Sequence, residues 1–322
     1  TDAAGQVSGI APCFHKNHSY GEYVFDHGWA DAFQRAGGRY YPKLQCAVPF
    51  TPVTGPRLFA AGGTAKAELA EGPIDLCAEE QASSVHITFL PEADWTALAG
   101  GPWLQRTDIQ FHWHNQGYGD FGDFIASLSS QKRKNIRKER AAVTAAGITI
   151  TCLTGRDITE AHWDAFHAFY IDTGSRKWGV PYLNRRFFSL IGDAMADHIL
   201  LVIATRAGRM IAGALNFIGS QALYGRNWGA IEHHPNLHFE VCYHQAIDFA
   251  IGRKLMRVEA GAQGPHKLAR GYLPQATHSL HYLAHPGLAR AVKRYLAVER
   301  AGVAEEREAL AAHSPFRQEQ DF

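Results

Sequence analysis

The chain has 322 residues, of which 46% are hydrophobic and 20% charged, and its 32 Lys and Arg residues nearly balance 31 Asp and Glu residues. The net charge of +1 argues against a generally basic nucleic-acid-binding protein, and the hydrophobic content is sufficient for a large buried core. The longest apolar runs, such as residues 199–204, are far shorter than the roughly 20 residues that cross a bilayer, so we expect no transmembrane segment and a cytoplasmic location.

The cysteines and histidines do not predict a metal site. The five cysteines are widely spaced and include no CxxC pair. His112 with His114, and His234 with His238, are closely spaced, but no carboxylate or thiol follows at a spacing typical of zinc ligands. We therefore expect reduced cysteines and no bound metal.

The N-terminal third looks like a partial copy of a unit that occurs again later in the chain. Residues 4–30 can be laid over residues 207–230, and residues 43–60 over residues 254–271, where both segments follow a helix and reach a Gly-Pro turn. In this alignment the first copy starts at its third strand. We therefore expect the N-terminal domain to be incomplete at its start.

A basic helix is predicted between the two copies, within residues 119–147. Its segment 130–140, "SQKRKNIRKER", contains six basic side chains and one acid. At 100° per residue the apolar side chains form one stripe and three arginines lie together beside it. The pattern is compatible with a solvated helix face, but few acids are interleaved to form i,i+4 pairs, which favours a site for an anionic ligand. The ligand-binding candidates on this helix are Arg133 and Arg137.

From residue 146 the periodicity predicts a strand, two helices, three strands, a helix, a strand, a short turn or helix, a further strand and a final helix. This order resembles that of the GNAT acyltransferase fold. The predicted segments are 148–155, 159–179, 183–196, 198–206, 209–219, 222–230, 237–254, 255–262, 278–284 and 286–302.

The predicted fold class is therefore α/β (α+β), with two GNAT-like acyltransferase domains in tandem joined by a basic helix. The expected divisions are an N-terminal GNAT-like domain, a basic linking helix, a C-terminal GNAT domain, and a C-terminal helix with its tail: 1–118, 119–145, 146–285 and 286–322.

Several motifs resemble the bacterial FemAB-like family of predicted N-acyltransferases, whose members are labelled peptidoglycan biosynthesis or recognition proteins. The motifs are "HSYGEYVFD", "PFTPVTGPRL", "GYGDFGDFIASLSSQKRKNIRKER", "HFEVCYHQAIDFAI" and "GAQGPHKLARGYLP". The resemblance covers almost the whole chain and implies two GNAT-like domains, with further sequence upstream of Thr1. It also implies transfer of an acyl group from a carrier to an amine. The donor would be acyl-CoA, acyl carrier protein or, by analogy with Fem-type transferases, aminoacyl-tRNA.

Acyl transfer to an amine requires a base, donors for the oxyanion and a slot for the carbonyl group. In a GNAT fold the slot lies where the fourth and fifth strands separate, here residues 222–230 and 255–262. Glu240 and Glu259 are candidate general bases in this region. Glu240 could instead favour a helix N-terminus, and Glu259 could form an ion pair with Lys267 or Arg270.

The Gly-rich segment 261–271 follows the second of these strands. Its His266 is a candidate base or oxyanion donor, and its other polar side chains suit a phosphate or carboxylate. The predicted binding residues of this segment are Gln263, Lys267 and Arg270. In the first domain, the corresponding candidates for substrate binding are His18, Tyr20 and Glu22.

The leading hypothesis is an N-acyltransferase that moves an acyl group from acyl-CoA or acyl carrier protein to a small amine by direct attack. No nucleophile elbow supports an acyl-enzyme. Residues 231–240 contain no glycine, unlike the usual GNAT pyrophosphate loop, which mildly favours a carrier protein or tRNA over acetyl-CoA. The alternatives are a Fem-like aminoacyl-tRNA-dependent transferase that acts on a cell-wall precursor, and a non-catalytic recognition module.

Overall fold

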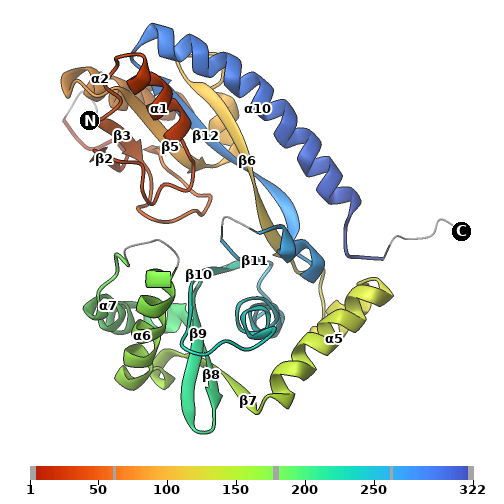
Figure 1. The fold of residues 1–322 in the computed structure, drawn as a ribbon. Coiled ribbons are helices and arrows are strands. Elements are labelled where there is room, and N and C mark those ends of the chain that lie inside the picture. Colours follow the sequence, from red (N-terminus) through yellow and green to blue (C-terminus); the bar gives the residue numbers. More distant parts are fainter. Residues whose placement is uncertain (1–4, 61–62, 177–180, 262–263, 318–322) are drawn as a thin grey trace, which may run out of the picture. The chain divides into compact units, whose positions relative to one another are not determined.

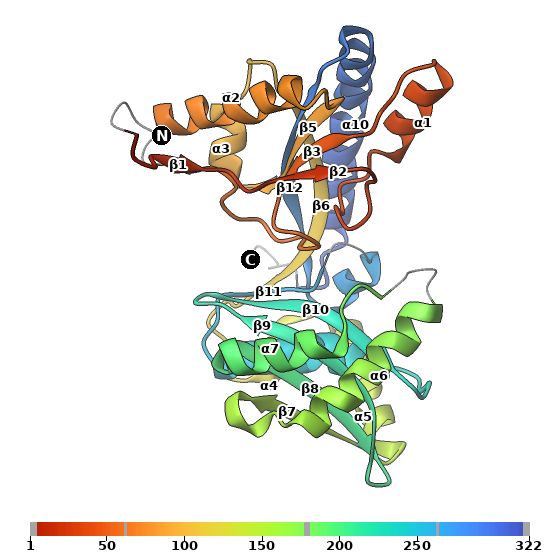
Figure 2. The same ribbon diagram turned by 90° about the vertical axis from the view of Figure 1, so that its left-hand side faces the viewer.

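The computed structural model describes residues 5–60, 63–176, 181–261 and 264–317, which form two compact units (Figures 1 and 2). Unit 1 comprises Thr1–Gln110 and Gln275–Ala309, and unit 2 comprises Phe111–Pro274 and Leu310–Phe322. Both units are therefore built from discontinuous segments, whereas the divisions expected from the sequence follow chain order. No helix in the described ranges is long and apolar enough to span a membrane.

The main sheet of unit 1 has the strand order β2-β3-β5-β12, and β6 follows β12. The β3 and β5 strands are parallel, whereas β2 pairs with β3, and β12 with β5, in antiparallel fashion. Strands β1 and β4 form a separate two-stranded sheet. The elements are β1 (Gly9–Ile10), β2 (Cys13–Lys16), α1 (His27–Arg35), β3 (Lys43–Cys46), β4 (Phe59–Ala60), α2 (Gly63–Glu79), β5 (Ser84–Leu90), α3 (Glu92–Ala97), β6 (Leu104–His114), β12 (Leu273–Leu283) and α10 (Pro286–Ala312).

The two faces of this sheet differ in polarity. Val85 and Ile87 of β5 join the apolar core that includes α2 residues, whereas the alternate residues His86 and Thr88 point to the opposite face. The same alternation in β3 and β12 places further polar side chains on that second face, and they are buried there. These side chains are Lys43, Gln45, Ser279 and His281.

Unit 2 contains the antiparallel run β7-β8-β9-β10, followed in the sheet by β11 and the end of β6. Helices α6 and α7 cover one face of this sheet, and α5 and α9 lie on the other (Figure 1). The elements are α4 (Phe121–Ser127), α5 (Ser130–Ala145), β7 (Ile148–Thr154), η1 (Gly155–Asp157), α6 (Glu160–Arg176), α7 (Arg185–Met195), η2 (Ala196–His198), β8 (Ile199–Arg206), β9 (Arg209–Ile218), β10 (Ala222–Ala230), α8 (Leu237–Phe239), η3 (Glu240–His244), α9 (Gln245–Gly252), β11 (Arg257–Glu259) and η4 (Pro265–Arg270).

Within the described residues, the helices and strands expected from residue 146 onward are confirmed, but one strand belongs to a different unit from the one expected. Residues 177–179 and 262 of the expected segments lie outside the described residues. Residues 278–284 were expected to complete the C-terminal sheet. They lie in β12, which pairs with β5 of unit 1. The antiparallel partner of β11 is instead β6, through His112–His114. Because strand pairing depends on non-local contacts, a local periodicity identifies the strand without identifying its neighbour.

Candidate functional site

The parallel strands β10 and β11 of unit 2 separate part-way along their length. Their ladder joins Ala222–Tyr224 to Arg257–Glu259 and ends there, although β10 continues to Ala230. The pairing of β10 with β9 also shifts register between Gly225 and Asn227. A β-bulge of this kind bends a strand and redirects its side chains. The sheet is therefore open beside Gly225, at the place where the sequence predicts an acyl-carrier slot.

A cavity of about 110 Å³ lies at this opening. Its wall combines the separated strands with one helical segment. The consecutive residues 225–228 of β10 contribute to it, so residues from both faces of the sheet reach the same space. The residues that line it include Asn216, Gly225, Asn227, Trp228, His238, Cys242, Tyr243, Ala260 and Gly261.

The helical wall contains a five-residue π-helix, η3, between α8 and α9. Tyr243 belongs to η3, and its hydroxyl lies 3.0 Å from Nε2 of His266 on η4. Burial raises the pKa of Tyr243, while burial and the nearby Lys267 and Arg270 lower the pKa of His266. A neutral imidazole beside a protonated phenol can accept a hydrogen bond from it and pass a proton. Tyr243 lines the cavity, and its contact with His266 would allow a proton to pass between the two side chains.

The η4 turn is tied to the basic helix α5 by the one acid of segment 130–140. The carboxylate of Glu139 accepts hydrogen bonds from Nη2 and Nε of Arg270, at 2.5 and 3.1 Å. The same carboxylate lies 3.0 Å from Nε2 of the buried His244. Burial tends to raise the pKa of Glu139, but His244 and Arg270 outweigh it and lower the pKa. The Arg270 guanidinium also lies 3.4 Å from the ring centroid of Phe239.

Glu259 ends β11 directly before the cavity-lining residue Ala260. Its side chain is buried, with Oε1 2.8 Å from Nε of Arg257. Its Oε2 has no hydrogen-bond partner among the described residues and lies 3.9 Å from Nε2 of His112. Burial raises the pKa of Glu259 despite the Arg257 charge. A carboxylate with a raised pKa and an unused oxygen has the properties of a general base.

The other catalytic candidate, Glu240, lies in η3, and neither it nor Glu259 is among the residues that line the cavity. Its Oε1 accepts hydrogen bonds from Nε of Arg140 at 3.2 Å and from Nε2 of Gln245 at 2.6 Å. This carboxylate thereby connects η3 to α5 and to the first residue of α9.

The binding candidates of segment 261–271 are held within the protein. Lys267 is buried, donates to the Gly261 carbonyl at 2.9 Å, and has its pKa lowered to about 8 by burial. Arg270 is paired with Glu139, as described above. Gln263 lies outside the described residues.

The two arginines of α5 have different surroundings. Nη1 of Arg133 donates to the Ala126 carbonyl at 3.2 Å, and so caps the end of α4. Arg137 is exposed to solvent. Arg137 is therefore the more accessible of the two, while Arg133 is half-buried.

The three candidates of the first domain lie in unit 1, in the segment between β2 and α1. Tyr20 is 71% exposed, and its backbone N–H donates to Nδ1 of His18. Glu22 is buried, with Oε2 2.7 Å from Nζ of Lys43. The structure therefore separates Glu22 from the exposed residues His18 and Tyr20.

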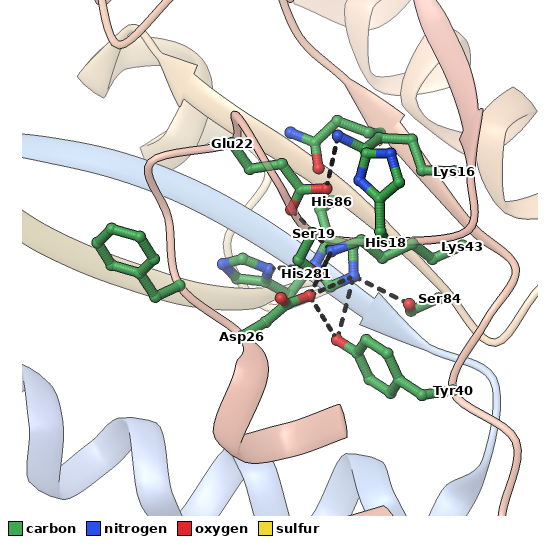
Figure 3. Close-up of polar contacts among 12 residues, drawn as sticks. Lys16, His18, Ser19, Glu22, Asp26, Tyr40, Lys43, Ser84, His86 and His281 are labelled. Carbon is green, nitrogen blue, oxygen red and sulfur yellow. Dashed lines mark hydrogen bonds and ion pairs between the residues drawn. The ribbon is translucent and has the colours of Figure 1, made fainter. Parts of the chain in front are cut away.

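Lys43 is the centre of a buried polar cluster in unit 1 (Figure 3). Its ammonium group is completely buried and donates to Ser19 Oγ at 2.7 Å, Glu22 Oε2 at 2.7 Å and Asp26 Oδ2 at 2.5 Å. The Tyr40 hydroxyl also donates to Asp26 Oδ2, at 2.7 Å. These contacts place Glu22 in a fixed position at one side of the cluster.

Several residues of the two sites were not predicted from the sequence. Tyr243 lies four residues after Phe239, and this helical spacing could have indicated that the two share one helix face, but not that His266 of η4 lies against it. Lys43 and Gln45 alternate with Leu44 and Cys46, but alternation predicts an exposed polar face, whereas this face is buried. In the described ranges, no group of three or more His, Cys, Asp or Glu side chains is placed to hold a metal ion.

Comparison with solved structures identifies the fold. FemX matches with a TM-score of 0.55 at 10% identity, covering 91% of this chain and 89% of FemX. L-PGS from Bacillus licheniformis matches with a TM-score of 0.55 at 7% identity, covering 79% and 82%. The C-terminal domain of a putative lysylphosphatidylglycerol synthetase from Agrobacterium fabrum matches with a TM-score of 0.56 at 4% identity, covering 79% and 81%.

Sequence comparison is more specific. No curated protein sequence matches the chain. The model of the FemAB-like family, described as peptidoglycan biosynthesis/recognition, matches residues 1–318. With its mixed α/β fold and this match over nearly its whole length, the chain belongs to the FemAB-like family of transferases.

Proposed function

We propose that unit 2 catalyses N-acyl transfer from a carrier to an amine at the opening between β10 and β11. The observation that carries this proposal is the cavity where their ladder ends. Strand edges that separate leave backbone N–H and C=O groups available to an extended ligand. An acyl carrier arm with amide groups can bind such an edge as an additional strand would, with its carbonyl carbon in the cavity.

The proposed chemistry is direct attack without an acyl-enzyme. Glu259 takes a proton from the acceptor ammonium, and the amine nitrogen then forms a bond to the acyl carbonyl carbon. The tetrahedral intermediate passes its second ammonium proton to water as the bond between the carbonyl carbon and the carrier breaks, and Glu259 returns its own proton to solvent before the next turnover. Tyr243 donates a proton to the departing carrier atom, and His266 hands Tyr243 a replacement from solvent. The products are an amide and the protonated free carrier.

For the donor, we propose acyl-CoA or acyl carrier protein. A second candidate is aminoacyl-tRNA, which the resemblance to Fem-type transferases implies. One observation favours this candidate: α5 presents the exposed cations Lys134, Arg137 and Lys138 along one helix. Binding of a polyanion through these side chains would weaken steeply as salt increases, because phosphate contacts release counterions.

The test is a mass-spectrometric transfer assay with each donor class and a panel of small amines. E259Q should lower the rate of amide formation by about 10²-fold or more, since general-base catalysis commonly contributes 10²–10⁴-fold. The matched control is D164N, which changes an exposed carboxylate of α6 in the same unit. Equal rates for E259Q and D164N would contradict the assignment of Glu259. Loss of activity at high salt with tRNA as the only accepted donor would select the second candidate.

A further inference from the structure

Unit 1 contains a second cavity, of about 220 Å³, beside the buried Lys43 cluster. This volume is below the 300–1,000 Å³ typical of sites for drug-sized ligands, so it suits a smaller molecule. One part of the wall is polar and another is apolar. The polar wall residues are His15, Lys16, Glu22, Gln45, Thr51 and Thr88, and the apolar ones include Phe14, Val48 and Phe50.

The carboxylate of Glu22 is held in place by a hydrogen bond from the buried Lys43. Its Oε2 accepts from Nζ of Lys43 at 2.7 Å, and Lys43 is fixed in turn by Ser19 and Asp26 (Figure 3). The side chains of Glu22 and Lys43 are 3% and 0% exposed. Because these contacts use Oε2, Oε1 remains as the atom of Glu22 that can serve a group at the cavity.

The ammonium group of Lys16 lies beside Oε1 of Glu22. Its Nζ lies 3.2 Å from Oε1 of Glu22 and donates to the backbone carbonyl of Tyr20 at 2.8 Å. A carboxylate and a carbonyl around one ammonium are the elements of a site for a primary amine. Lys16 is only partly buried and has a long flexible stem, so it can swing to solvent at small cost.

The charges of the buried cluster favour a cation at the position that the Lys16 ammonium group occupies. The buried cluster contains one ammonium group, on Lys43, and two carboxylates, on Glu22 and Asp26. The neighbouring imidazole of His86 is neutral, since burial lowers its pKa to about 3. Without Lys16 the cluster would carry one uncompensated negative charge, which is costly in a buried site unless a cation is present.

Gln45 supplies a second polar group on the cavity wall. It is 2% exposed, and its Nε2 donates to Thr88 Oγ1 at 2.8 Å. Its Oε1 has no hydrogen-bond partner among the described residues. A buried acceptor without a donor costs about 1–3 kcal/mol, so a ligand that brings an N–H or O–H group is favoured here. An anionic ligand could pair with Lys16, but it would also face two acceptors, Glu22 and Gln45.

We propose that the cavity of unit 1 binds a small primary amine, whose ammonium group replaces that of Lys16 at Glu22 and whose apolar part packs against Phe14, Val48 and Phe50. The site lies wholly within unit 1, and the proposal is independent of the acyl-transfer site proposed in unit 2. Lys16 acts in it as an internal competitor that occupies the site when no amine is bound.

Isothermal titration calorimetry of the whole chain with three matched probes tests the proposal. The probes are 2-phenylethylamine, the neutral 2-phenylethanol and the anionic phenylacetate. We expect the amine to bind at least about tenfold more tightly than either of the others, because hydrogen bonds to charged groups contribute about 1.5–3 kcal/mol. Tighter binding of phenylacetate, or no saturable binding of the amine at millimolar concentration, would overturn the proposal.

The K16M variant distinguishes an internal competitor from a ligand-binding lysine. Removing the competing ammonium should tighten amine binding about tenfold. Weaker binding in K16M would contradict the proposal. The control is K66M, since Lys66 forms an ion pair with Asp94 in the same unit and does not line the cavity. Its affinity for the amine should equal that of the wild type.

Two further variants test the polar wall of the cavity, at Glu22, and its apolar wall, at Val48. E22Q should weaken amine binding by about tenfold or more through loss of the charged acceptor. Because E22Q also removes a partner of the buried Lys43, V48W provides a test outside the cluster. Val48 is 47% exposed and lines the cavity, so a tryptophan there can fill it from the rim. Unchanged amine binding in a folded V48W protein would show that the amine binds elsewhere.

Discussion

Glu139 on α5 accepts two hydrogen bonds from the guanidinium of Arg270, which lies 131 residues later in the chain. This pair connects the basic helix to the η4 turn that carries His266. The single acid in segment 130–140 therefore has a structural partner, while cations such as Arg137 remain exposed. Part of the basic helix forms the support of the candidate site, and part of it faces solvent.

E139Q should destabilise the protein by about 2 kcal/mol. The change leaves the buried Arg270 without its counterion, and breaking a buried ion pair costs about 3–5 kcal/mol, which partial exposure reduces. Urea unfolding at neutral pH measures the change. R137Q, on the exposed side of the same helix, should stay within about 0.5 kcal/mol of the wild type. Similar losses in both variants would mean that α5 helicity, and not the Glu139–Arg270 pair, is responsible.

Y243F should lower the rate of acyl transfer by about 10²-fold with little change in stability, because it removes the proposed proton donor but keeps the ring. The measurement is kcat under donor saturation, together with the unfolding free energy. Y118F is the control, since Tyr118 is a partly buried tyrosine of unit 2 that contacts Ser127 and does not line the cavity. A Y243F enzyme with the kcat of Y118F would exclude Tyr243 as proton donor.

The pH profile of acyl transfer should report the raised pKa of Glu259. As pH falls through this pKa, the carboxylate becomes protonated and can no longer act as a base. The acid limb of kcat/KM should therefore lie above the ordinary glutamate pKa of 4.5. The limb should disappear in E259Q, whose residual rate is lower. A wild-type limb that persists in E259Q would assign the titration to another group.

The folding stability of unit 1 should decrease as the pH is lowered, even while the carboxylates are still ionised, because His86 is buried in its neutral form. Burial lowers the pKa of His86 to about 3 in the folded state, below the value of 6.5 expected when the chain unfolds. The unfolded state therefore binds more protons below pH 6.5, and stability present above that pH is lost as pH falls toward 3. At pH 5 the loss from His86 alone is about 2 kcal/mol.

Urea unfolding at pH 7.5 and pH 5.0 measures this loss, and other buried histidines add to it. The informative quantity is therefore the loss of unfolding free energy between pH 7.5 and pH 5.0, compared between the wild type and H86N. The variant should lose less stability than the wild type over this interval, even if it is less stable at pH 7.5. An identical loss in both proteins would contradict a neutral buried His86.

Much of unit 2 could be predicted from sequence because its pattern is local. The apolar spacing of Trp163, Phe166 and Phe169 indicates α6, and the continuous apolar strands β8 and β9 indicate a sheet covered on both faces. The position of Glu259 at the end of β11 also followed from strand order. The buried polar face around Lys43 could not be predicted, because its partners Asp26 and Glu22 come from a loop and are defined only by tertiary contacts.

The role of Glu240 shows the same limit within the candidate site. Its place at the start of a helical segment could be read from the sequence, whereas its contacts with Arg140 and Gln245 depend on how α5 packs against η3. Likewise, the pairing of His112 with Glu259 in the sheet register follows from β6 taking the place expected for residues 278–284.

G229A should destabilise the protein by about 3 kcal/mol. A Cβ at Gly229 would overlap the backbone of Phe169, so α6 would have to move away from β10. Thermal unfolding compares this variant with G252A, where an added Cβ meets no atom within 4 Å. G252A should be neutral or slightly stabilising. Equal stability of the two variants would contradict the close packing of α6 on β10.

The most direct test of the central claim is native mass spectrometry of the wild type and of A260F, after incubation with acyl-CoA, acyl carrier protein and aminoacyl-tRNA in separate panels. Ala260 lines the cavity between β10 and β11, so a phenylalanine there should fill it. We predict that the wild type retains one donor class and that folded A260F retains none. Retention of the same donor by A260F, or of no donor by the wild type, would contradict an acyl-transfer site at the opening between these strands.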